Sequence, residues 1–257
     1  MVKLLGDKLF LAPINKNPNR VLDIATGTGI WAIDFADEFP ETEVTATDIR
    51  TSQPTWVPPN LKFEVDDMNL EWTWPENHFD FVHYRVLYGC VRDWEELYTK
   101  TFRHLKPGGW MQHLEMATTL ESDRVTSEEQ KILDQWGGLF IKAGEKTGCR
   151  FDIAREHKMK DTLNTVGFID IVEESVTIPC GSWPKERRFK ESGILIQLSI
   201  EESLEGLATY LCTENLGWSK EEVTILVARM RNIVKRRSNC SYIKAYVSPE
   251  STVLCGH

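Results

Sequence analysis

The sequence predicts an α/β protein built on a doubly wound, mostly parallel sheet, and three observations support this prediction. Short apolar runs alternate with helical patterns from residue 20 to about residue 115. A glycine-rich turn follows the first apolar run. Acidic residues end or follow the next two. Strands that alternate with helices form a parallel sheet with right-handed crossovers, which is the doubly wound arrangement.

The first half of the chain carries the strand–helix alternation. A first helix is expected at residues 28–39, where Ile30, Ile33 and Phe35 have helical spacing and Pro40 ends the pattern. Glycine and proline after residue 105 stop a second helix. The expected strands are 20–24, 43–48, 61–65, 79–84 and 110–115, and the second helix is 93–104.

The second half is more helical, and it contains no internal repeat or clear linker. Helices are expected at 127–147, 153–166, 201–213 and 220–237, and strands at 169–176 and 251–255. We therefore expect one domain over residues 1–257. Its cofactor-binding half would cover residues 18–116, and a helical insertion with the C-terminal part would cover 117–257.

Composition and charge exclude several kinds of partner. The net charge of −9 argues against a groove for a nucleic-acid backbone. The basic run 229–237 fits a solvated helix end better than a nuclear-localisation or nucleic-acid patch. No stretch is apolar enough to cross a bilayer, and the six cysteines lack zinc-ligand spacing. We expect a cytoplasmic protein, with the nucleus as the alternative, that binds neither metal, membrane nor nucleic acid.

The strongest functional signal is a strand that ends in a glycine turn at a helix N-terminus. Residues 21–29 read Val-Leu-Asp-Ile-Ala-Thr-Gly-Thr-Gly, and the first helix follows. Gly27 and Gly29 allow a ligand to approach the backbone amides closely. The turn also fits the dinucleotide-binding pattern, which by itself is a weak signal.

Three carboxylates favour S-adenosyl-L-methionine over NAD as the ligand. Asp23 lies at the end of the first strand, where it can accept from an ammonium group or a water and would repel a pyrophosphate. Asp48 closes the second strand and can accept from both ribose hydroxyls. Asp67 follows the third strand and can accept a hydrogen bond from the exocyclic amine of adenine. A ligand that carries a sulfonium and an amine suits these three acids.

These motifs, with Leu105-Lys-Pro-Gly-Gly109, resemble those of class I S-adenosylmethionine-dependent methyltransferases. That resemblance implies a Rossmann-like, seven-stranded, doubly wound sheet. More narrowly, nearly the whole chain resembles the fungal LaeA-like family, which is associated with secondary metabolism. The motifs that carry this second resemblance are Ala12-Pro13, Gly27-Thr-Gly-Ile-Trp-Ala-Ile33, Gln53-Pro-Thr-Trp-Val-Pro-Pro-Asn60, Asp93-Trp94, Gly217-Trp218-Ser219 and Val253-Leu-Cys-Gly256.

The resemblance implies a set of cofactor-binding residues. In it, the glycine turn contacts the methionine portion, Asp48 the ribose, and Asp67 the adenine, while Tyr84 lines the methionine and acceptor side. The full expected set is Asp23, Ala25, Gly27, Gly29, Asp48, Ile49, Asp67, Met68 and Tyr84.

The chain also departs from the family pattern. Ala25 replaces the usual first glycine of the turn, and Gln112 stands where relatives carry an acid. Relatives have more residues before the Ala-Pro motif, and these often cover the cofactor. We expect weak, micromolar or poorer cofactor binding unless helix 127–147 closes over the site, hinged at Gly137-Gly138, or a homodimer supplies the cover.

Methyl transfer needs little from the protein beyond alignment in a dry pocket. If a base is needed, Glu115 is preferred because the end of the fifth strand faces the ligand crevice in open α/β sheets. His113 and Tyr84 complete the candidate catalytic set. His113 and His83 also alternate with apolar residues, as satisfied sheet histidines do. Four aromatic residues fit either an acceptor pocket or the core, and these are Trp136, Phe140, Trp183 and Trp218.

The sequence therefore predicts a methyltransferase that acts on an O or N atom of a small secondary metabolite. Two alternatives remain open. One is an S-adenosylmethionine-binding regulator of secondary metabolism that works within a protein complex. The other is an isomerase or pericyclase that retains S-adenosylmethionine and uses its charge.

Overall fold

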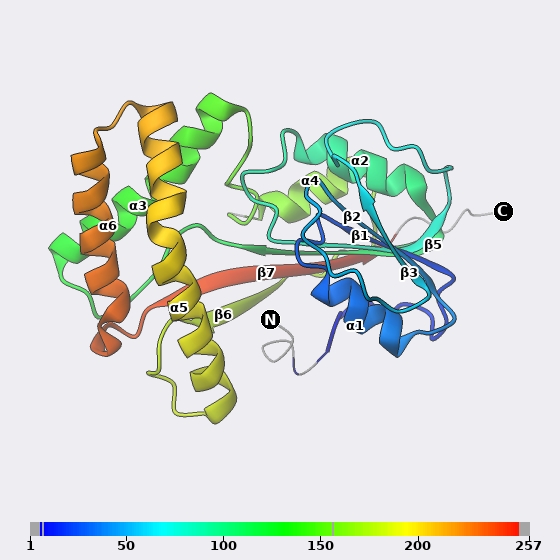
Figure 1. Cartoon of the computed structure of the whole chain (residues 1–257), viewed down its shortest axis with the longest axis horizontal. Coiled ribbons are helices and arrows are strands. Elements are labelled where there is room, and N and C mark those ends of the chain that lie inside the picture. Colours follow the sequence, from blue (N-terminus) through cyan, green and yellow to red (C-terminus); the bar gives the residue numbers. More distant parts are fainter. Residues whose placement is uncertain (1–5, 7, 156, 252–257) are drawn as a thin grey trace. The chain divides into compact units, whose positions relative to one another are not determined.

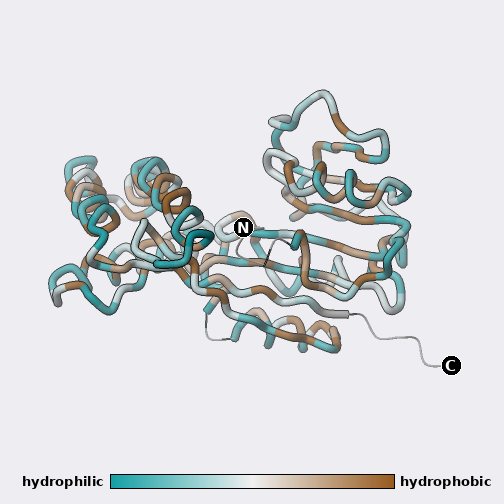
Figure 2. Tube along the Cα trace, turned by 90° about the horizontal axis from the view of Figure 1, so that it is seen from below, coloured by the Kyte–Doolittle hydropathy of each residue, from teal (hydrophilic) through white to brown (hydrophobic). Residues whose placement is uncertain are grey.

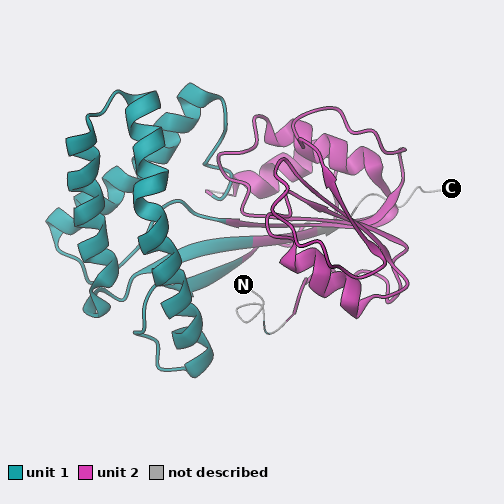
Figure 3. Ribbon diagram, viewed as in Figure 1, with its two compact units in different colours: residues 1–7, 116–154, 175–246 teal, residues 8–115, 155–174, 247–257 magenta. Residues whose placement is uncertain are grey.

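The computed structural model describes residue 6 and residues 8–155 and 157–251, and the chain forms two compact units (Figure 3). Unit 1 contains residues 1–7, 116–154 and 175–246, and unit 2 contains residues 8–115, 155–174 and 247–257. The chain passes from unit 2 to unit 1 between residues 115 and 116. The chain then returns twice to unit 2, which the sequence did not indicate.

Seven strands form a sheet with the order β3-β2-β1-β4-β5-β7-β6 (Figure 1). The pairings β3–β2, β2–β1, β1–β4 and β4–β5 are all parallel, so the doubly wound, mostly parallel prediction is confirmed. The strands are β1 Arg20–Ile24, β2 Glu43–Asp48, β3 Leu61–Val65, β4 Phe79–Arg85, β5 Leu105–Met116, β6 Glu174–Pro179 and β7 Tyr242–Ser251.

In unit 2 the helices cover both faces of the sheet (Figure 1). Helix α1 (Ile30–Glu38) lies on one face, and α2 (Trp94–His104) and α4 (Lys158–Val166) lie on the other. Two residues of β4 face opposite sides of the sheet. Phe81 contacts Trp31 and Phe35 of α1. Tyr84 stacks near Tyr98 of α2. Side chains alternate between faces along a strand, so odd and even positions of β4 enter different layers.

Unit 1 is mainly helical. Its helices α3 (Ser127–Thr147) and α6 (Lys220–Lys235) each begin with a capping box, at Thr126 and at Ser219. Helix α5 (Arg187–Tyr210) continues into a π-helical turn, Leu211–Asn215, and the 3-10 turn Arg237–Asn239 follows α6. Brown and teal alternate along these helices in Figure 2, as expected for amphipathic helices that bury one face.

Several elements of the second half differ from the prediction. The helix expected from 153 begins at Lys158, because His157 takes a left-handed φ of 61° just before it. The helix expected from 201 begins at Arg187, and the strand expected at 169–176 lies at Glu174–Pro179. The last strand is Tyr242–Ser251, where Ile243, Ala245 and Val247 alternate inward. Residues 252–255 of the strand expected there lie outside the described residues.

The basic run 229–237 ends α6, as the favoured interpretation predicted. Lys235 pairs with Glu201 at 3.5 Å, and Arg236 pairs with Glu129 at 2.6 Å, so both cations are engaged within unit 1. None of the helices in the described part of the chain is long and apolar enough to cross a membrane.

Candidate cofactor site

The turn between β1 and α1 departs from ordinary backbone geometry at three positions. Ala25, Gly27 and Gly29 have φ values of 52°, 63° and 78°. A Cβ at Gly29 would lie 2.3 Å from Cζ of Phe63, so packing as well as φ requires glycine there. A Cβ at Gly27 would meet nothing within 4 Å. The Cα side of Gly27 is therefore open, which leaves room for a ligand beside the turn.

Asp48 lies against this turn. Its Oδ2 accepts a hydrogen bond from the Gly27 amide at 2.8 Å, and its Oδ1 accepts from the Arg50 amide at 3.0 Å. The residue is half-buried. A carboxylate has about four lone-pair sites, so two remain for other donors. The structure thus joins the end of β2 to the glycine turn and leaves Asp48 able to accept from a pair of hydroxyl groups.

The loop after β2 also holds the turn, through residues that the sequence reasoning did not select. Nε2 of Gln53 donates to the Gly27 carbonyl at 2.7 Å, and Oγ of Ser52 donates to the same carbonyl at 3.1 Å. These bonds fix the Gly27 peptide against the loop. Gln53 stands in a family motif, but a motif without assigned chemistry gave no sign of this contact.

The segment after β3 forms a tight polar turn. Oδ1 of Asp67 accepts from the Asn69 amide at 2.9 Å and from its side chain at 3.0 Å, and Asp66 accepts from the Asp67 amide at 2.8 Å. Met68 lines a cavity of about 110 Å³ with residues of the α2 region. Ile49, beside Asp48, is 67% exposed and leaves an apolar surface next to the turn. The roles of these residues in binding adenine and ribose stay predictions.

Asp23 is only 3% exposed, and both of its oxygens are engaged. Oδ1 lies 2.7 Å from Nδ1 of His83, and Oδ2 accepts from the Thr26 hydroxyl at 2.5 Å. Burial lowers the pKa of His83, so its neutral ring donates to the carboxylate. Asp23 points into the layer under α1 and fixes Thr26 within the turn, and its contact with an ammonium group or a water stays a prediction.

His83 connects this buried pair to α1. Its ring stacks on Trp31, with ring centroids 3.7 Å apart and planes 6° from parallel. Nε1 of Trp31 in turn donates to the Leu9 carbonyl at 2.9 Å. Of the two interpretations of His83, the structure favours the satisfied sheet histidine over the base.

Gln112 has a structural role that the sequence did not indicate. Its Oε1 accepts from the Leu11 amide at 2.5 Å and from the Ala12 amide at 3.1 Å. This binds the Ala-Pro motif to β5. Gln112 therefore holds the N-terminal segment in this chain, and the loss of a site carboxylate stays a prediction.

Tyr84 and His113 are both completely buried beside each other in the sheet. Tyr84 lies within β4, and its completely buried hydroxyl donates to Sδ of Met111 at 2.5 Å. His113 pairs with Tyr84 across β4 and β5, and its Nδ1 lies 2.8 Å from the Tyr98 hydroxyl. Its ring stacks on Trp94, with centroids 5.0 Å apart. Both side chains belong to the layer under α2, and their roles at the acceptor side stay predictions.

Glu115, the preferred base, is also completely buried. Its Oε2 accepts from the Leu87 amide at 2.8 Å and lies 3.5 Å from Nε2 of His113. Burial and the charge of Glu115 raise the pKa of Tyr88 to about 12. The carboxylate thus holds the loop after β4, where the β-branched Val86 has a strained φ of 56°. This arrangement does not support the base role.

Two other expected features also prove structural. In unit 1, α3 runs unbroken through Gly137, where a Cβ would lie 2.3 Å from Cγ2 of Thr119, so Gly137 is a packing contact, and the hinge expected at Gly137-Gly138 stays a prediction. In unit 2, Asp80 accepts from the Arg20 amide and from Nζ of Lys106, each at 2.8 Å. The Lys-Pro-Gly-Gly motif therefore fastens the amino ends of β1 and β4.

Comparison with known proteins agrees with this fold. Residues 3–171 match the family model described as "Methyltransferase domain". The chain is 36% identical over 235 residues to methyltransferase pytC of Aspergillus terreus, covering 91% of this chain and 72% of pytC. It is 36% identical over 241 residues to the secondary metabolism regulator LAE1 of Cochliobolus heterostrophus, covering 91% of this chain and 76% of the regulator.

A solved structure shares the fold. Phosphoethanolamine N-methyltransferase 2 of Haemonchus contortus, in complex with S-adenosyl-L-methionine, superposes with a TM-score of 0.55 at 20% identity. The match covers 94% of this chain and half of the Haemonchus chain. The matched family model, the relatives and the geometry of the glycine turn agree: the chain belongs to the methyltransferase-domain family, with relatives among the fungal methyltransferases and regulators of secondary metabolism.

Proposed function

We propose that the protein transfers a methyl group from S-adenosyl-L-methionine to an O or N atom of a small secondary metabolite. The observation that carries this proposal is the open turn at Gly27, with the Asp48 carboxylate bonded to its amide at 2.8 Å. A nucleoside with two neighbouring hydroxyl groups suits this carboxylate. The same edge also holds Asp67, which can accept from an amine.

The residues of this edge fit S-adenosyl-L-methionine. That cofactor supplies an already activated methyl group when bound, so the protein has mainly to orient the acceptor and exclude water. Asp48 and the Gly27 turn would hold the nucleoside, and Asp23 would fix the turn from below through Thr26. The acids of the site favour a cofactor with a positive charge over a pyrophosphate.

Transfer in this proposal proceeds without a side-chain base from β4 or β5. Tyr84, His113 and Glu115 are all completely buried and bonded to neighbours. An acceptor that needs no base during transfer fits this arrangement: a neutral amine attacks with its lone pair and releases a proton to water only after it is methylated, and an acidic hydroxyl is already ionised. We place this activity in the cytoplasm.

The test is turnover. The purified chain is incubated with S-adenosyl-L-methionine and fractionated fungal metabolites, and S-adenosylhomocysteine and methylated products are followed by mass spectrometry. Asp48→Ala should reduce product formation, whereas the neighbouring Asp66→Ala should not. Equal S-adenosylhomocysteine formation with and without metabolites would contradict the proposal. A changed metabolite without S-adenosylhomocysteine would indicate an isomerase or pericyclase instead.

A second candidate function is supported by one comparison. The regulator LAE1 is as similar to this chain as pytC is, at 36% identity over 91% of the chain. A regulator would act in a protein complex, and the nucleus is then the compartment to examine. Affinity purification from a fungal host separates the two candidate functions. The unchanged chain and Asp48→Ala serve as the two baits. A stable protein complex that depends on Asp48, without metabolite turnover, favours regulation.

A further inference from the structure

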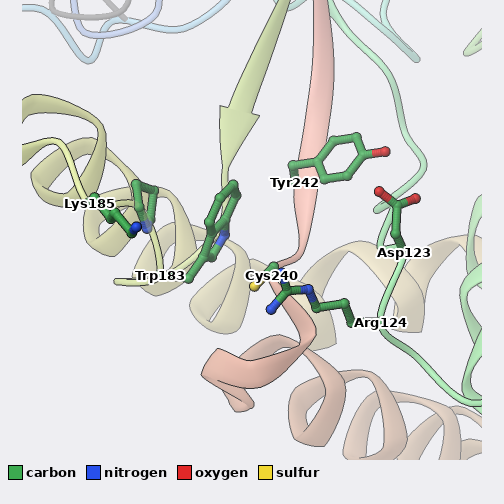
Figure 4. A pocket seen from close by; sticks show the side chains of 7 residues that line it. Asp123, Arg124, Trp183, Lys185, Cys240 and Tyr242 are labelled. Atoms are coloured by element: carbon green, nitrogen blue, oxygen red, sulfur yellow. The ribbon is translucent and has the colours of Figure 1, made fainter.

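A cavity in unit 1 is lined by none of the residues assigned above to the cofactor site. Its volume is about 440 Å³, within the range of small-molecule pockets. Three segments, 123–124, 183–185 and 240–242, form its walls, and all three belong to unit 1. Figure 4 shows the lining side chains, which are Asp123, Arg124, Trp183, Pro184, Lys185, Cys240 and Tyr242.

The walls of this cavity are fastened to one another. Nε1 of Trp183 donates to the Ser241 carbonyl at 2.9 Å, which fixes the plane of the indole. The Ser122 hydroxyl donates to the Asn239 carbonyl and accepts from the Arg124 amide at 3.1 Å. These bonds join the segments at 123–124 and 183–185 to the third segment, near residue 240. A cavity with fixed walls loses little entropy when a ligand enters.

The cavity carries a net positive charge although the chain as a whole has a net charge of −9. Arg124 and Lys185 both line it, and neither forms an ion pair with a carboxylate of the described residues. Asp123 is the one acidic side chain in the described lining. Burial, with the charges of Glu121 and Asp123, raises the pKa of Tyr242, so its phenol stays neutral. Two free cations therefore face one carboxylate.

We propose that this cavity is a second small-molecule site and binds a planar aromatic anion. The ring of the ligand stacks on the indole of Trp183, and its acidic group pairs with Arg124 and Lys185. A cationic ligand would be repelled by these two side chains, and a neutral ring would gain the stacking alone. The site stands whether or not the chain transfers methyl groups.

Cys240 provides a reporter inside the cavity. Its thiol is partly exposed, and it lines the wall beside Arg124 (Figure 4). The full chain is alkylated with iodoacetamide in the presence of 2-naphthoate, and each cysteine is followed by peptide mass spectrometry. Naphthoate should slow alkylation of Cys240. Cys90, which is exposed and lies in unit 2, should react at an unchanged rate.

Two comparisons decide the proposal. The neutral 2-naphthamide should protect Cys240 about tenfold less well than 2-naphthoate, because it lacks the charge. The double variant Arg124→Gln, Lys185→Gln changes two exposed side chains, so it should fold normally and lose the preference for naphthoate. Trp183→Phe keeps an aromatic ring, so this variant should retain the preference for naphthoate. Equal protection by both compounds, an unchanged double variant, or no protection at millimolar naphthoate would overturn the proposal.

Discussion

Two regions at the carboxyl edge of the sheet in unit 2 carry acids that look alike in the sequence but have opposite surroundings. At the β1–β2 end, Asp48 is half-buried, and within the described part of the chain its carboxylate is bonded only to the amides of Gly27 and Arg50. At the β4–β5 end, Glu115 is completely buried and bonded to the Leu87 amide. Asp48 can still accept from a ligand, whereas Glu115 holds the protein together.

The difference depends on strand parity and on the loop that follows each strand. Glu115 and His113 are two residues apart, so both enter the layer under α2, where Trp94 and Tyr98 cover His113. Asp48 is the last residue of β2, and the loop after it folds back on the glycine turn instead of over the carboxylate. A position at the end of a strand therefore does not by itself make a residue catalytic.

The largest expected effect tests the buried side of this comparison. Glu115→Ala should lower the free energy of unfolding by about 2–3 kcal/mol, since the buried Leu87 amide loses its acceptor. Glu115→Gln keeps an acceptor oxygen and should lose less than about 1 kcal/mol. Urea unfolding of both variants measures this. If Glu115 were the base, Glu115→Gln would stay stable and lose turnover by about 10²–10⁴-fold.

The open side of the comparison is tested by affinity. Asp48→Ala should weaken S-adenosyl-L-methionine binding by about 2–3 kcal/mol, or roughly 30–150-fold, because two hydroxyls lose a charged acceptor. Calorimetry gives the dissociation constant. Tyr84→Phe is the matched control, since its hydroxyl bonds only within the protein and its loss should leave affinity unchanged. Loss of affinity in Tyr84→Phe would place that residue back in the site.

The buried pair beneath the turn should make stability depend on pH. Burial holds the pKa of His83 below its usual value in the folded protein, while the unfolded chain binds a proton below about pH 6.5. Stability from this group is therefore present above that pH and is lost as pH falls, by up to about 1.4 kcal/mol per pH unit. The free energy of unfolding, measured with urea between about pH 7.5 and pH 5, should change less steeply with pH for His83→Gln than for the unchanged protein. The same pH dependence of stability in both proteins would show that His83 does not titrate in this way.

The smallest expected effect concerns the turn itself. Ala25 has a φ of 52°, which costs an L-residue about 1–2 kcal/mol, so Ala25→Gly should stabilise the protein by about 0.5–1 kcal/mol. Thermal unfolding with and without cofactor measures this. Gly27→Ala should destabilise the protein, because Gly27 has a positive φ. It should also weaken cofactor binding, because its methyl group would occupy the open side of the turn. A stabilised Gly27→Ala variant would contradict the geometry of the site.

The sequence alone determined the parts of this protein that depend on local pattern. The strands from β1 to β3 lie at the predicted residues, because short apolar runs between glycine, proline and acidic turns have one favourable local structure. The glycine turn and the acid that ends β2 were recognisable for the same reason. Helix α3 begins and ends at the predicted residues, since its capping box and terminal Gly148 mark them.

Tertiary structure decided which polar residues are open to a ligand. Asp23 and Asp48 both close a strand, but His83 and Thr26 occupy Asp23, and these partners come from contacts that sequence spacing does not encode. Gln112 binds amides one hundred residues away in the chain, and its role could not be inferred locally. The cavity in unit 1 is likewise closed by three distant segments, two of which are joined by a hydrogen bond between residues 117 positions apart. Local pattern fixes strands and turns, whereas burial and partners depend on which layer each side chain enters.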